Sequence, residues 1–158
     1  MPQTSGMDSP QIGELSPEEI SALLERNHVG RIAYSMHDRV NIEPISYVHS
    51  AGWLYGRTSL GAKLATLEKN KWVAFEVDEV KSLLDWQSVV VHGGIYILEP
   101  EVPPGAKNEW ADALTILRRL LPATFREDDP VPFRDIVFRI AIQETTGKRS
   151  SRPAHHKS

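Results

Sequence analysis

The segment from residue 86 to residue 98, W-Q-S-V-V-V-H-G-G-I-Y-I-L, constrains the fold more than any other part of the chain. It is typical of one long strand, and the pair Gly93-Gly94 interrupts it. Glycines inside a strand indicate a bulge or a bend where a sheet curls. Most neighbouring strand-like segments are joined by short turns, which predicts a mainly β protein: a six-stranded antiparallel split barrel with flanking helices. The other five segments are residues 30–35, 40–48, 53–55, 72–78 and 133–143.

Three helices are expected outside this barrel. Ser16, Pro17 and Glu19 form a capping box with proline at the first helical position, so a helix is predicted from there to about Asn27. A second helix is predicted to begin near Gly61, and a third spans residues 108–121 with an apolar stripe at helical spacing.

Size and composition limit the remaining possibilities. The chain has 158 residues, 41% of them hydrophobic, which predicts one domain over residues 14–149 with disordered tails at 1–13 and 150–158. A formal net charge of −3 gives no strong field toward nucleic acid or acidic membranes. The lack of cysteine excludes disulfides and cysteine chemistry. Because no apolar run approaches about 18 residues and no signal-peptide pattern is present, a cytoplasmic location is expected.

Residues 53–70, W-L-Y-G-R-T-S-L-G-A-K-L-A-T-L-E-K-N, suggest an anion site. A short strand ends in hydroxyl side chains, and a helix with free backbone N–H groups is predicted to follow. Such a helix N-terminus favours a phosphate. Arg57 and Lys63 would add charge-assisted contacts, and Thr58 and Ser59 would add hydroxyl donors. The alternative is that Thr58 or Ser59 merely caps the helix and the two cations are solvated. Lys63 is the better cation candidate, because Arg57 would face away from Thr58 on a strand.

Several segments in order resemble the FMN-binding split barrels of the pyridoxamine 5'-phosphate oxidase superfamily, and most closely its NimA-like (nitroimidazole resistance) branch. The resemblance covers about residues 15–149. One departure concerns Gly56-Arg57, where the NimA-like branch often has Phe-His, so no role of that histidine is transferred. The matching segments are residues 29–33 (V-G-R-I-A), 43–47 (E-P-I-S-Y), 55–64 (Y-G-R-T-S-L-G-A-K-L), 73–78 (V-A-F-E-V-D), 86–93 (W-Q-S-V-V-V-H-G) and 144–149 (E-T-T-G-K-R).

This resemblance implies a homodimer with FMN in clefts at the dimer interface. By position, the FMN phosphate would be held by Arg57, Thr58, Ser59 and Lys63. The edge of the isoalloxazine ring would lie along Glu43, Pro44, Ile45, Ser46 and Tyr47, largely through their backbone groups. Trp86 and Ser88 would contact the ring and could come from the other subunit.

The leading functional hypothesis is an FMN-dependent oxidoreductase that reduces a small acceptor such as a nitroaromatic or quinone-like compound. Bound flavin carries the redox chemistry in such enzymes, and the sequence shows no clear catalytic acid or base. A deazaflavin in place of FMN stays open. The alternatives are a flavin- or haem-binding sensor or carrier without turnover, with His92 as haem ligand, and an apo dimer with a vestigial cleft.

The other candidate residues have plainer interpretations. No histidine forms a metal-ligand spacing, so no metal is expected. Tyr47 is either a flavin-edge residue or a core aromatic. Trp86 is either a flavin contact or a residue of the core or the dimer interface. Glu76, Asp78 and Glu79 are expected at a solvated strand edge or in dimer salt bridges rather than in acid–base catalysis. The acidic residues 127–129 are expected in a solvated loop.

Overall fold

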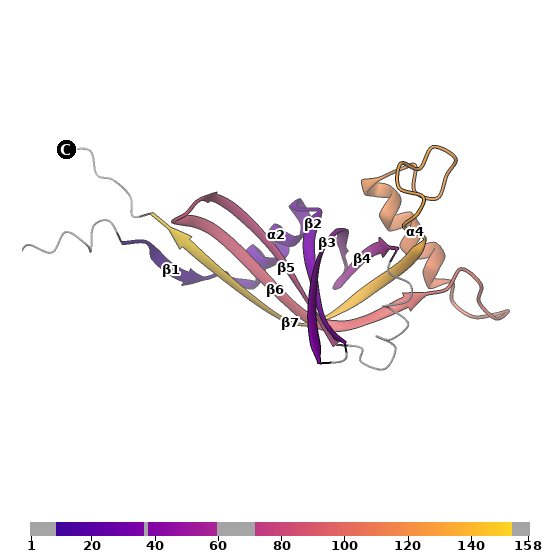
Figure 1. Ribbon diagram of the computed structural model, residues 1–158, viewed down its shortest axis with the longest axis horizontal. Helices are drawn as coiled ribbons and strands as arrows, with labels where there is room; N and C mark the ends of the chain where they lie inside the picture. The colour runs from indigo at the N-terminus through magenta and orange to yellow at the C-terminus, as the bar shows by residue number, and fades with distance from the viewer. Residues whose placement is uncertain (1–8, 37, 60–71, 153–158) are drawn as a thin grey trace, which may run out of the picture.

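The structure is a computed structural model that describes residues 9–36, 38–59 and 72–152. The second predicted helix therefore lies outside the described residues. The first predicted helix begins as expected, because the Ser16 hydroxyl accepts from the Glu19 N–H at 3.2 Å and the Glu19 carboxylate accepts from the Ser16 N–H at 3.0 Å. The elements are β1 Gln11–Glu14, α2 Pro17–Arg26, β2 Val29–Met36, β3 Arg39–Ser50, β4 Trp53–Thr58, β5 Trp72–Ser82, β6 Asp85–Leu98, α4 Glu109–Leu120 and β7 Ile136–Ser151 (Figure 1).

The described strands form one antiparallel sheet that closes on itself. Its order is β1-β7-β4-β3-β2-β5-β6, and β6 also pairs with β7. Strands β2 to β7 therefore make the predicted six-stranded barrel. The β6–β7 ladder shifts register between His92 and Gly93, and a β-carbon on Gly93 would collide with the backbone carbonyl of Ala141. This confirms the irregularity that the glycine pair predicts.

The sheet extends further at both ends of the chain than the sequence suggests. Strand β1 pairs with residues 148–151 of β7, which corrects the predicted tails at residues 11–13 and 150–151. The physical reason is the length of β7. Strand β6 pairs with one edge of β7 along most of its length. On the opposite edge, β4 pairs with β7 only as far as Ala141, and β1 pairs with it from Lys148 onward. The predicted strand segment ends at residue 78, but residues 79–82 continue β5 in its ladder with β6.

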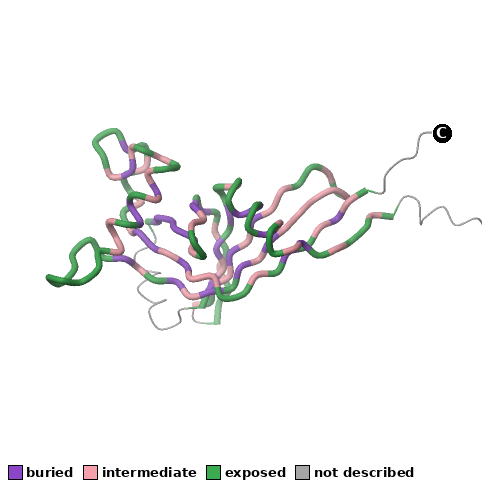
Figure 2. The backbone as a smooth tube through the Cα atoms, turned by 180° about the vertical axis from the view of Figure 1, so that it is seen from behind, coloured by how far each residue is buried: buried purple, intermediate pink, exposed green. Residues whose placement is uncertain are grey.

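Two hydrophobic clusters lie on the two faces of the sheet. The larger one fills the barrel, and the apolar face of α2, with Leu23 and Leu24, packs into it. The smaller one lies between α4 and strands β3, β4, β6 and β7, with Tyr55, Leu117 and Val137 as members. Figure 2 shows that the loops at the ends of the molecule are largely exposed. Helix α4 thus makes a second layer on part of the outer face of the barrel.

Candidate functional site

Strand β3 loses its β4 neighbour where the sequence predicts the flavin edge. The described ladder between the two strands ends at the pair Tyr47–Gly56, whereas the ladder with β2 continues through Pro44. Pro44 and Ser46 are exposed, and Ile45 and Tyr47 are buried. The predicted site residues therefore divide by strand alternation into an outward pair, available to a ligand, and an inward pair that belongs to the core.

The side chain of Tyr47 is a core residue. Its hydroxyl donates a hydrogen bond to the carbonyl of Leu24 at 2.7 Å, and its ring meets that of Phe75 edge-on with 5.2 Å between centroids. Burial raises the pKa of this hydroxyl well above its ordinary value.

Glu43, the first residue of the predicted flavin edge, accepts a hydrogen bond from the Tyr34 hydroxyl at 3.4 Å.

Arg57 forms a buried, bidentate ion pair with Asp129. The guanidinium nitrogens Nη1 and Nη2 lie 2.6 and 2.7 Å from the two carboxylate oxygens. The side chains of Arg57 and Asp129 are only 8% and 2% exposed. The Arg57 guanidinium also lies 4.9 Å from the centroid of the Phe125 ring. The charge predicted to meet a phosphate is therefore already balanced within the chain.

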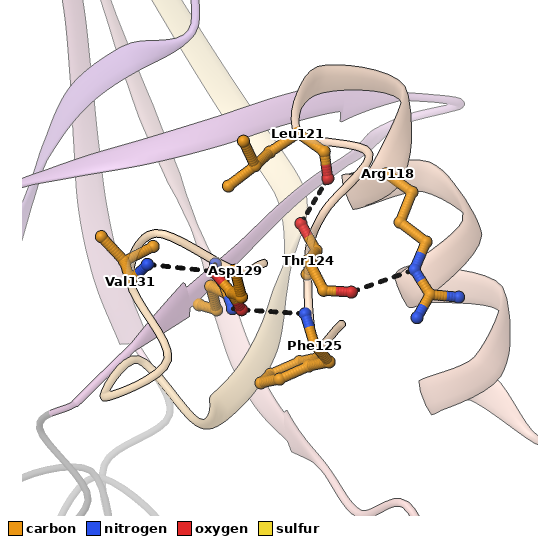
Figure 3. A network of polar contacts seen from close by, with 7 residues as sticks. Arg118, Leu121, Thr124, Phe125, Asp129 and Val131 are labelled. Carbon is orange, nitrogen blue, oxygen red and sulfur yellow. Dashed lines mark hydrogen bonds and ion pairs between the residues drawn. The ribbon is translucent and has the colours of Figure 1, made fainter. Parts of the chain in front are cut away.

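Asp129 organises the loop that follows α4 (Figure 3). Besides the two bonds from Arg57, its carboxylate accepts from the backbone N–H groups of Phe125 at 2.8 Å and Val131 at 3.0 Å. These hydrogen bonds, with that from Arg57 the largest cause, hold the pKa of Asp129 well below its ordinary value. The prediction of a solvated loop is therefore wrong at Asp129. It is a buried anchor, whereas its neighbours Glu127 and Asp128 are exposed.

The other predicted phosphate ligands are only partly described. Thr58 is the last residue of β4 and is buried, and Ser59 follows in an exposed bend. Lys63 lies outside the described residues. The side chains of β4 alternate between the two faces of the sheet, as expected for a strand. Arg57 lies on the outer face with Phe125 and α4. Gly56 lies on the inner face, because a β-carbon there would meet the Phe138 ring of the barrel core. Thr58 therefore faces the barrel side, and Ser59 is the exposed hydroxyl at the strand end.

Trp86 and Ser88 lie on β6, separated from β3 within one chain by strands β5 and β2. Trp86 is half-buried and lines a polar hollow with Arg26 and Glu79. The hydroxyl of Ser88 donates to the Glu76 carboxylate at 3.0 Å. One chain therefore does not bring Trp86 and Ser88 together with Pro44 and Ser46.

The carboxylates of the predicted strand edge form two ion-pair groups. Arg31 lies 3.5 Å from both Glu76 and Asp78. Burial raises the pKa of Glu76, and a hydrogen bond with Asp78 adds to the effect. Glu79 instead receives two 2.7 Å bonds from Arg26, which lower its pKa to about 2. These side chains serve as ion-pair partners on the sheet.

A cavity of about 320 Å³ opens beside Ser46 and Arg57. Its other walls come from β2, from α4 and from the loop after α4. Sequence reasoning missed these residues because they lie far apart in the chain; the apolar stripe of α4 was the only signal. The lining residues are His28, Val29, Ser46, Arg57, Leu117, Leu120, Leu121, Thr124, Val131 and Arg134.

The described residues contain no group of three His, Asp or Glu side chains placed to hold a metal ion. His92 is exposed on β6 and lines a shallow hollow of about 280 Å³ with Val40 and Trp72. No helix in the described part of the chain has the length and apolar character needed to cross a membrane.

A closed antiparallel barrel of six strands defines the class of split β-barrels. It carries a helical layer on its outer face, and the described part of β4 leaves the β3 edge at Ser46 unpaired beside a cavity. The chain belongs to the family described as Pyridoxamine 5'-phosphate oxidase, whose sequence profile matches residues 16–149.

Solved structures support this assignment. An FAD-binding protein from Mesorhizobium loti is 28% identical, with a TM-score of 0.69 over 89% of this chain and 99% of that chain. A proposed pyridoxamine 5'-phosphate oxidase from Corynebacterium glutamicum is 28% identical, with a TM-score of 0.67 over 88% and 98% of the two chains.

Two further proteins are similar to this chain. A proposed 5-nitroimidazole resistance protein from Bacteroides thetaiotaomicron is 16% identical over 90% of this chain and 89% of that chain, with a TM-score of 0.64, and shares the fold. An uncharacterized protein of Rhizobium meliloti is 33% identical over 79 residues, which are 50% of this chain and 52% of that relative. The match thus spans about half of the curated relative's length.

Proposed function

We propose that the protein binds FMN and acts as an FMN-dependent oxidoreductase on a small acceptor such as a nitroaromatic or quinone-like compound. The observation that carries the proposal is the outward edge of β3 at Pro44 and Ser46, which lies beyond the described β4 ladder, with Ser46 lining the 320 Å³ cavity. Membership of the family and the similarity to an FAD-binding protein support a flavin as the ligand.

The residues present fit a flavin at this edge. Ser46 offers a hydroxyl and, with Pro44, an accessible stretch of backbone for the polar edge of the ring. In the proposal, Ser59 and Lys63 hold the phosphate, with Thr58 at the strand end. Arg57 retains N–H donors beyond the two given to Asp129, but its paired charge makes it the weaker phosphate ligand.

When bound, the flavin supplies the electron or hydride transfer. The chain then has three tasks: it binds the phosphate, orients the ring along β3 and excludes water with the apolar wall formed by α4. The proposal assigns no side chain as an essential acid or base. The alternative of a flavin carrier without turnover differs from it only in lacking reduction by a donor, so NADH, NADPH and reduced deazaflavin are the donors to test.

We also propose a homodimer, because one chain separates Trp86 and Ser88 from β3. An apolar strip crosses the outer face of β3, β2 and β5. Val40, Ile42 and Trp72 in this strip are 77%, 65% and 61% exposed. In the proposal, a second copy covers this strip, and the partner subunit supplies Trp86 and Ser88 at the flavin edge. The expected cytoplasmic location stays a prediction.

The dimer is tested by sedimentation with Ile42→Glu. This change should yield a monomer and also weaken flavin binding, because a charge in the contact would be desolvated without a partner. The control is Leu83→Glu, since Leu83 is 86% exposed at the β5–β6 turn. The dimer would be contradicted if the wild-type protein sediments as a monomer and binds flavin with the same affinity as Ile42→Glu.

The cofactor is tested by titrating FMN and FAD into the apoprotein and following flavin fluorescence. Lys63→Ala should weaken FMN binding by about 1–3 kcal/mol, the scale of a lost charge-assisted hydrogen bond. Lys107→Ala is the control, because Lys107 lies exposed in the loop before α4. Unchanged FMN affinity in Lys63→Ala would place the phosphate elsewhere, and a Soret band in place of flavin absorption would select haem.

A further inference from the structure

The cavity beside Ser46 has an apolar wall and a polar rim. Leu117, Leu120 and Leu121 come from the last turn of α4 and its C-cap. Val29 belongs to β2, and Val131 belongs to the loop after α4. A volume of about 320 Å³ lies at the small end of the roughly 300–1,000 Å³ usual for small-molecule sites. The space suits a compact ring compound rather than an extended polar chain.

The loop that forms the outer wall is fixed in place. Arg118 donates a hydrogen bond through Nε to the carbonyl of Thr124 at 3.1 Å, and Thr124 donates to the carbonyl of Leu121 at 2.6 Å (Figure 3). Phe125 has a φ of 55°, a left-handed conformation that is uncommon outside glycine. Its N–H bond to Asp129 and its ring stacking on Trp110 hold it there. Hydrogen bonds and ring stacking therefore hold the loop that forms this wall of the cavity.

The two arginines that line the cavity differ in charge balance. Arg57 is neutralised by Asp129 in bidentate geometry. Arg134 is half-buried, and no carboxylate among the described residues pairs with it; its guanidinium lies only 6.0 Å from the centroid of the Phe133 ring. Among the described residues that line the cavity, Arg134 is thus the arginine without a carboxylate partner, and it lies beside an apolar wall.

From this geometry we propose that the cavity binds a one- or two-ring monocarboxylate, with Arg134 as the contact for the carboxylate and the leucines of α4 as the contact for the ring. A single uncompensated guanidinium matches one carboxylate, which it can hold through two N–H donors. Because Ser46 belongs to both the cavity and the flavin edge, a member of this class that also carries a nitro or quinone group is assigned as the electron acceptor. It takes up two electrons from the reduced flavin and two protons, and a donor such as NADH reduces the flavin again. That assignment rests on the proposed function, whereas the binding itself does not.

The test is calorimetric titration of the full chain, with and without FMN, using 2-naphthoate and its neutral analogue 2-naphthamide. We expect 2-naphthoate to bind once per chain and about tenfold more tightly than the amide, as a charge-assisted hydrogen bond provides. Arg134→Gln should abolish this preference and leave the affinity for the amide within about twofold. Arg119→Gln is the matched control, because Arg119 is exposed on α4 and does not line the cavity.

A second variant keeps the result interpretable if Arg134→Gln folds poorly. Leu120 is 37% exposed, so we expect the Leu120→Asp variant to fold. Its carboxylate should weaken the binding of 2-naphthoate more than that of the amide. Equal affinities for the two probes, an unchanged preference in Arg134→Gln, or displacement of 2-naphthoate by FMN would overturn the inference. Binding of 2-naphthoate by a chain that takes up no flavin would leave the inference standing and remove only the proposed function.

Discussion

The buried Arg57–Asp129 pair gives the sharpest prediction. Asp129→Asn keeps the size of the side chain and removes its charge. Since the two side chains are only 8% and 2% exposed, the Arg57 cation would stay in the interior without a counter-ion. Breaking one partner of such a pair costs about 3–5 kcal/mol in the free energy of unfolding. The loss should appear in urea unfolding of the apoprotein at neutral pH, followed by tryptophan fluorescence and circular dichroism.

A matched control lies elsewhere in the same chain. Arg26 and Glu79 also form a bidentate pair at 2.7 Å, but their side chains are 48% and 31% exposed. Glu79→Gln should therefore cost only about 0–1 kcal/mol. Equal losses for Asp129→Asn and Glu79→Gln would refute the argument from burial. The double variant Arg57→Met with Asp129→Asn should lose less than the sum of the single changes, because no unpaired charge remains.

Two further predictions concern pH and Tyr47. The folded-state pKa values of Asp129 and Glu79 are depressed, so the stability they contribute is present above their unfolded values and is lost as the pH falls. The free energy of unfolding should fall as the pH is lowered from about 5 to about 2, and it should fall less steeply in Glu79→Gln than in the wild type. Equal pH slopes for the two proteins would contradict this prediction. Tyr47→Phe should cost about 1 kcal/mol through the lost bond to Leu24 and leave FMN affinity unchanged. Weaker FMN binding at unchanged stability would make Tyr47 a ring contact.

Local signals in the sequence predict the features that depend on neighbouring residues. The capping box at Ser16 and Glu19 forms as its spacing requires, and Gly93 lies at the register shift. The antiparallel pairing of β2 with β3, β3 with β4 and β5 with β6 follows from the short turns that join them. The closure of the sheet depends instead on β7, which is distant in the sequence from β4 and follows β6 only after α4. Tyr47 shows the limit of this reasoning, because strand alternation assigns it to a face, but only the position of α2 decides what its hydroxyl contacts.

The candidate site depends on contacts that local patterns do not encode. Arg57 and Asp129 are 72 positions apart in the sequence. The residues around Arg57 are typical of a phosphate-binding loop, and those around Asp129 are typical of a solvated acidic loop, so neither local pattern predicts the pair. The position of Arg134 at the cavity likewise depends on the conformation of the loop after α4. Strand β1 has no apolar alternation, and only the open edge of β7 accounts for it.

The pairing of β7 with three other strands has a consequence for the order of folding. Residues 136–151 supply the partner for β4, for β6 and for β1, so no closed ring exists until they are available. On the ribosome, the edges of β1, β4 and β6 that pair with β7 therefore stay unpaired until nearly all of the described chain has been synthesised. Such waiting segments are prone to wrong association. A nascent chain halted before residue 136 should accordingly engage chaperones, and one that extends past residue 151 and clears the exit tunnel should become resistant to protease.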